Sequence, residues 1–117
     1  MRTTNTLRVD TGRVENSGSE RLTPIAYGFV FSGGSKDTSG STSNFTTTWN
    51  ASLNRYEITI SGHNYFYASY VTTVTSSGGT NVVLPTTSSV SGKLLVYLHN
   101  LSGTRVQGDF QFVTYKK

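Results

Sequence analysis

The sequence has no cysteine and only two histidines among its 117 residues. The lack of cysteine excludes disulfides, cysteine-ligated zinc and thiol nucleophiles. The histidines are His63 and His99, and no third ligand lies at a spacing that would complete a metal site with them. A site built from one histidine of each of three chains stays open as an alternative. From the residues of one chain we predict no metal and no other cofactor.

Long apolar runs are also missing. The longest uncharged stretches are full of serine, threonine and glycine, so we expect no insertion into a membrane. Residues 1–10 contain no apolar run of the kind that marks a signal peptide.

Charge is scarce and dispersed. Charged residues make up 14% of the chain, and ten basic against six acidic residues give a net charge of +4. The basic residues are scattered, and only Lys116 and Lys117 are adjacent. A surface that follows a phosphate backbone needs several cations converging on one path. We therefore predict that nucleic acid is not a partner.

Catalytic patterns are absent as well. There is no G-x-S-x-G nucleophile elbow, and nothing distinguishes one serine from another. Three of the six carboxylates fall within the first 23 residues, and Glu57 alternates with Arg55 as a surface pair. This leaves no pair of carboxylates suited to glycoside hydrolysis. We predict that the protein is not an enzyme.

Serine and threonine are abundant instead, with 35 residues between them, and glycine adds 12. Alanine occurs only three times, and no window shows the spacing of an amphipathic helix. β-Branched and aromatic residues alternate with polar ones in short segments separated by turn residues. The predicted fold is all-β: an antiparallel β-sandwich or jelly roll of about seven or eight short strands.

The alternation also predicts where the strands lie. The expected strands are 25–32, 45–49, 55–60, 65–70 continuing into 71–75, 81–84, 93–99 and 104–115. Pro85 should end the strand before it, and Gly108 with Asp109 should bend the last one. The intervening loops 33–43, 61–64, 76–80 and 85–92 are rich in hydroxyl and amide groups.

Residues 1–23 differ from the rest. They contain few apolar side chains and a polar stretch at 15–20, with room for one strand around 6–10. Such a segment either packs on a partner or stays mobile. We therefore predict two parts: an N-terminal arm or linker, 1–23, and a β-sandwich domain, 24–117.

An aromatic cluster follows the third expected strand. Several rings occur within eight residues, so alternation cannot place all of them in one core. Exposed rings could stack on a sugar while neighbouring amides and hydroxyls bind its hydroxyl groups. Burial in the core or at a subunit interface remains the alternative. The candidate ligand-binding residues are His63, Asn64, Tyr65, Tyr67, Tyr70 and Trp49.

Several segments together resemble a known family. These are 27–30 (YGFV), 44–49 (NFTTTW), 55–60 (RYEITI) and a terminal hairpin from 91 to 115. The pattern resembles the C-terminal tip domains of phage and prophage tail fibres and of related bacterial fibrous surface proteins. The resemblance covers about residues 24–117, with one departure, because Tyr-Phe-Tyr at 65–67 replaces the usual aliphatic run.

The resemblance implies a non-enzymatic terminal domain of a fibrous protein. Such a domain would form a homotrimer and attach to a glycan or protein receptor on a host or cell surface. It would belong to a virion tail fibre or to the extracellular surface of a cell. Apolar strand positions such as Leu95 and Tyr97 would then be shared between subunits. Two alternatives remain: a trimer-capping domain without a ligand, and a monomeric carbohydrate-binding module.

Overall fold

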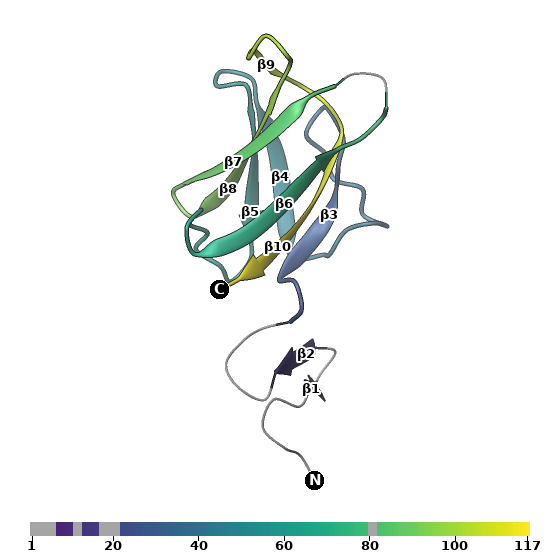
Figure 1. Cartoon of the computed structure of the whole chain (residues 1–117), viewed down its shortest axis with the longest axis vertical. Helices are drawn as coiled ribbons and strands as arrows, with labels where there is room; N and C mark the ends of the chain where they lie inside the picture. Colours follow the sequence, from purple (N-terminus) through teal and green to yellow (C-terminus); the bar gives the residue numbers. More distant parts are fainter. Residues whose placement is uncertain (1–6, 11–12, 17–21, 80–81) are drawn as a thin grey trace.

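The computed structural model describes residues 7–10, 13–16, 22–79 and 82–117 and has the predicted all-β fold (Figure 1). Eight antiparallel strands within residues 22–79 and 82–117 form two sheets. These strands are β3 (Ala26–Val30), β4 (Phe45–Asn50), β5 (Arg55–Ile60), β6 (Tyr70–Ser76), β7 (Leu84–Val90), β8 (Lys93–His99), β9 (Arg105–Val106) and β10 (Phe110–Lys116). In the part of the chain described, no helix is long and apolar enough to cross a bilayer.

The two sheets have different sizes. The three-stranded sheet has the order β3-β10-β6, and the larger sheet has the order β4-β5-β8-β7 with β9 paired to β8. Within the N-terminal segment, β1 (Leu7–Asp10) and β2 (Arg13–Asn16) pair antiparallel as a separate sheet. The single strand expected around 6–10 is therefore one half of a hairpin. Residues 1–6, 11–12 and 17–21 of the predicted arm lie outside the described residues.

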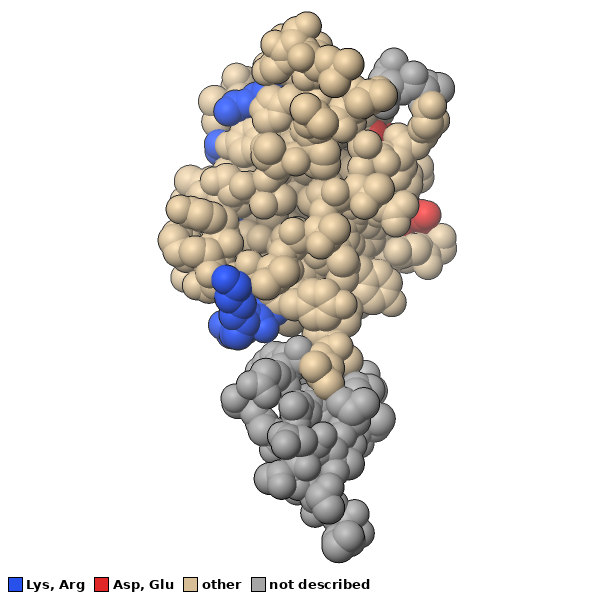
Figure 2. Space-filling view, in the orientation of Figure 1, with Lys and Arg blue, Asp and Glu red and all other residues tan. Residues whose placement is uncertain are grey.

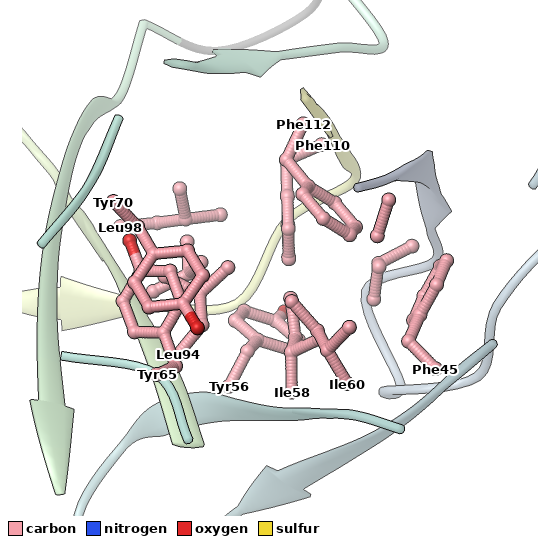
Figure 3. Close-up of a cluster of buried hydrophobic side chains, with 13 residues drawn as sticks. Phe45, Tyr56, Ile58, Ile60, Tyr65, Tyr70, Leu94, Leu98, Phe110 and Phe112 are labelled. Carbon is pink, nitrogen blue, oxygen red and sulfur yellow. The ribbon is translucent and has the colours of Figure 1, made fainter. Parts of the chain in front are cut away.

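The core lies between the two sheets and contains every second side chain of several strands (Figure 3). Tyr56, Ile58 and Ile60 of β5 are buried, as are Leu94, Val96 and Leu98 of β8 and Phe110 and Phe112 of β10. Aromatic rings connect the sheets edge to face: Phe45 with Phe112 and Tyr56 with Phe110. Each pair joins a strand of one sheet to a strand of the other, so the rings hold the layers together.

The last strand is bent at Gly108 and Asp109, as expected. The hydroxyl of buried Tyr56 accepts a hydrogen bond from the Gly108 amide at 3.0 Å and donates to the Ser32 carbonyl at 2.7 Å. The backbone at Gly108 bends toward Tyr56 at this point. Before the bend, β9 pairs in the larger sheet, and after it β10 belongs to the smaller sheet. The turn before β9 contains Gly103, whose φ is 82°.

Two predicted boundaries are wrong. Residues 84–90 form β7, where the sequence pattern predicts a strand ending at 84 and a loop over 85–92. Pro85 lies inside this strand, opposite Leu98. β7 is the last strand of its sheet, and an edge strand tolerates the missing N–H of proline. Residues 65–69 are not a strand. The Tyr65 amide donates to the Gly92 carbonyl, and the Ser69 amide donates to the Phe66 carbonyl and so forms a turn.

The segment 33–43, expected as an open loop, lies along the free edge of β3. The amides of Asp37 and Thr42 donate to the carbonyls of Phe29 and Tyr27, at 2.9 and 2.8 Å. The Phe29 amide donates to the Ser41 hydroxyl at 3.1 Å. These bonds satisfy the exposed edge of β3 and hold the segment in place.

Candidate functional site

Two of the predicted ligand-binding tyrosines are core residues. Tyr65 and Tyr70 are 3% and 6% exposed, and their rings stack with centroids 4.7 Å apart (Figure 3). The Tyr65 hydroxyl bonds to Thr72, and burial raises the pKa of Tyr65 above its ordinary value. Their ring faces are therefore not available to stack on a ligand, which corrects the prediction for these two residues. The backbone bond of Tyr65 to Gly92 turns the chain inward at this point.

The other residues of the aromatic cluster lie nearer the surface. Tyr67 is 57% exposed, and its ring packs against Phe66, which is 51% exposed. Asn64 is exposed, and His63 is half-buried with Nδ1 3.2 Å from the hydroxyl of Tyr70. Asn64 and Tyr67 are thus the two members of the predicted set with substantial exposure.

Trp49 does not join this cluster. It pairs with Tyr56 in the β4–β5 ladder, and its ring lies 4.7 Å from the Tyr56 ring. The 61–64 turn follows Ile60, at the other end of that hairpin. The six predicted residues therefore do not form one site.

A different surface combines exposed rings with polar groups: the outer face of the three-stranded sheet. In the strand register, Val113 lies between Tyr27 and Thr73. In the adjacent row, Gln111 lies between Phe29 and Thr75. Together with Asp37 and Gly40 from the 33–43 segment, these residues line an open depression of about 510 Å³, which we call the sheet-face hollow.

The sheet-face hollow is amphipathic, and Asp37 is the one charged residue among its described lining residues. Tyr27 is 49% exposed, so its ring is available for contact. The hydroxyls of Thr73 and Thr75 can donate and accept, and Gln111 uses one amide hydrogen toward the Ser77 hydroxyl at 3.3 Å. Charged side chains are few and lie toward the margins of the face shown in Figure 2. Such a surface can pack a ring against a ligand's C–H groups while hydroxyls bind its polar groups.

The sequence carries a signal for this site in the strand that forms its rim. Ile25, Tyr27, Phe29 and Phe31 alternate on one side of the strand, and small residues occupy the other. The small side, Ala26 and Gly28, faces the core, so the aromatic side faces outward. Alternation defines two faces but does not say which one another layer covers, which is why sequence reasoning missed the site.

A second depression, of about 750 Å³, lies at the end of the sandwich that carries the 100–103 turn. Two of its polar side chains already bind backbone amides of the chain. Asp109 Oδ1 accepts from the Ser32 amide at 2.8 Å, and Asn100 Oδ1 accepts from the amides of Ser102 and Thr104. Among its described lining residues there is no aromatic ring. It therefore offers a ligand less than the sheet-face hollow does.

The outer face of the larger sheet is covered by charged side chains. Glu57 contacts Arg55 at 2.9 Å and Lys93 at 3.6 Å, and Arg105 lies over the ring of Tyr97. Hydrogen bonds from Asn50 and then Arg55 lower the pKa of Glu57. Leu95 is only 2% exposed within the single chain, so it has little apolar area left to share between subunits.

Metal-ligating side chains do not gather within the described residues: no group of three from His, Cys, Asp and Glu occurs there.

Comparison with protein-family models, with curated proteins and with solved structures finds no match to this chain. Its function is therefore inferred from the geometry of the sheet-face hollow.

Proposed function

We propose that this chain is a non-catalytic β-sandwich domain that binds a cell-surface glycan in the sheet-face hollow. The exposed ring of Tyr27 beside free hydroxyl and amide groups is the observation that carries the proposal. A pyranose has apolar C–H faces and a rim of hydroxyls, so it needs both kinds of partner. Tyrosine offers a ring to pack against, and threonine and glutamine can both donate and accept.

The position of the hollow supports this role. Its floor consists of hydrogen-bonded strands, and its wall is held to the β3 edge by the bonds of Asp37, Ser41 and Thr42. A site on such supports keeps its geometry without a ligand, which lowers the entropic cost of binding.

The family resemblance supports a place for the domain at the end of a fibrous protein, on a virion tail fibre or a cell surface. In that setting three copies would lie close together as a homotrimer. Single-site contacts with sugars are weak, and several linked sites raise the overall affinity without any new contact. Receptor attachment would then follow from avidity.

The test is a glycan screen followed by titration of the strongest binder with two matched variants. Tyr27→Ala removes the ring of the hollow, and we expect at least about tenfold weaker binding. Tyr67→Ala removes a similarly exposed ring outside the hollow and should leave affinity unchanged. If Tyr67→Ala abolishes binding and Tyr27→Ala does not, the site lies in the 61–69 loop and the proposal is wrong.

A trimer-capping role is the second candidate, because the same face also exposes Phe31 and Val71. If this face is a subunit contact, light scattering on a sizing column should give three times the monomer mass, and Tyr27→Ala should dissociate it. The complete core within one chain would instead suit the third alternative, a monomeric carbohydrate-binding module. A stable monomer that binds a polysaccharide supports that alternative.

A further inference from the structure

One carboxylate faces the sheet-face hollow with an unused oxygen. Asp37 Oδ1 accepts hydrogen bonds from the amide and hydroxyl of Ser39, at 3.2 and 2.9 Å. Asp37 Oδ2 makes no hydrogen bond within the described part of the chain. The side chain is half-buried and lines the wall of the hollow. Because one oxygen is fixed by Ser39, the other is held in position to accept a donor from a ligand.

The charge of Asp37 is not neutralised by the hollow. No cation occurs among the described lining residues. The neighbouring Lys36 points elsewhere: its Nζ donates to the carbonyls of Thr42 and Phe45 and lies 4.2 Å from the centre of the Phe45 ring. A ligand in the hollow therefore meets a negative charge and a vacant acceptor.

Resting on the proposed function, we infer that Asp37 selects the class of glycan. The hollow takes sugars that present hydrogen-bond donors without negative charge, and it favours a protonated amino sugar over its neutral counterpart. Both sugars can donate a hydrogen bond to the carboxylate, and a protonated amine adds the attraction between opposite charges. Sugars with carboxylate, sulfate or phosphate groups place like charge against Asp37 and are rejected.

Three probes of equal length test this inference: a glucosamine oligosaccharide, its fully N-acetylated form and an oligogalacturonate. For the unaltered protein, calorimetry at a pH where the amine is protonated should rank them in that order, with no binding of the last. Raising the salt concentration should weaken only the binding of the glucosamine probe, because salt screens the attraction between charges.

Asp37→Asn keeps an oxygen for Ser39 and removes the charge. We expect this substitution to weaken binding of the glucosamine probe about tenfold and to change the affinity for the N-acetylated probe by less than about twofold. Asp109→Asn is the matched control, since it removes one carboxylate at the other depression and should change neither affinity. Circular dichroism should show the same fold for both variants.

The outcomes separate the two proposals. Equal binding of the anionic and neutral probes, or an Asp37→Asn protein with an unchanged preference, overturns the inference about charge while leaving the hollow as the binding site. Binding that Tyr27→Ala does not weaken overturns the site itself. Failure of every probe and of the wider glycan screen overturns both.

Discussion

Gly28 lies in the middle of β3, where the strand comes closest to its neighbours. A Cβ at this position would lie 2.3 Å from the Ser41 hydroxyl and 2.7 Å from the ring of Phe45. These atoms belong to the wall of the hollow and to the core, so neither can move freely. The absence of a side chain at Gly28 thus lets the 33–43 segment approach the β3 strand.

The first prediction concerns this residue. Gly28→Ala should lower the free energy of unfolding by about 1–3 kcal/mol, because the methyl group overpacks a filled site. Denaturant unfolding of the purified protein measures the change. Gly33→Ala is the control, since no atom lies within 4 Å of the position that its methyl group would take, and it should be close to neutral. A Gly28→Ala protein as stable as the control would show that the wall yields easily.

At the scale of elements, the edges of the two sheets are protected by different means. The 33–43 segment covers β3 through backbone and side-chain hydrogen bonds. At the far edge of the larger sheet, β7 carries Pro85, which has no N–H to donate. Exposed strand edges pair readily with other chains, and a proline interrupts that pairing.

The second prediction follows from this edge. Pro85→Thr should change the free energy of unfolding by less than about 1 kcal/mol, because Pro85 is only partly buried on an edge strand and threonine suits a strand position. The variant should aggregate more readily on heating, as its edge regains a donor. Static light scattering during a thermal ramp measures this, with Thr86→Ser as a control on the same strand. Equal scattering from the Pro85→Thr and unaltered proteins would contradict the protective role.

β7 also illustrates the limit of local sequence patterns. Proline normally ends a strand, so the local pattern predicts a loop over residues 85–92, of which 85–90 belong to β7. Their pairing with β8, from Leu84–His99 to Val90–Lys93, depends on a partner that is already in place. By contrast, alternation alone predicts the bounds of β5 and β8, because apolar side chains recur at every second position of each strand.

For the whole molecule, two buried tyrosines connect stability to pH. Burial is the main cause that raises the pKa of both Tyr56 and Tyr65 above the ordinary tyrosine value of 10.0. The folded state therefore holds these protons more tightly than the unfolded state does. Their contribution to stability is complete below about pH 10 and is lost as the pH rises through the folded-state pKa values.

The third prediction is an alkaline loss of stability. The urea midpoint should fall above about pH 10, as Tyr56 and Tyr65 lose their protons more readily in the unfolded state. Tyr65→Phe should reduce the fall at high pH, although the lost bond to Thr72 lowers stability at neutral pH by about 1 kcal/mol. Tyr67→Phe is the control, because Tyr67 is exposed. A midpoint that does not change with pH in this range would contradict the assignment.

The fold class, most strand positions and most residues of the core follow from the amino-acid sequence alone. They do so because period-two alternation of apolar side chains is a local property that one strand carries without its neighbours. Tertiary contacts, in contrast, set which aromatic rings are buried and which are exposed. Tyr65 and Tyr70 turn inward, with Tyr65 bonded to Gly92 and Thr72 and its ring stacked on that of Tyr70.

Tyr27 faces outward because Ala26 and Gly28, on the opposite side of β3, are small enough for the second sheet to pack against. Exposure depends on what covers a face, and the covering elements come from distant parts of the chain.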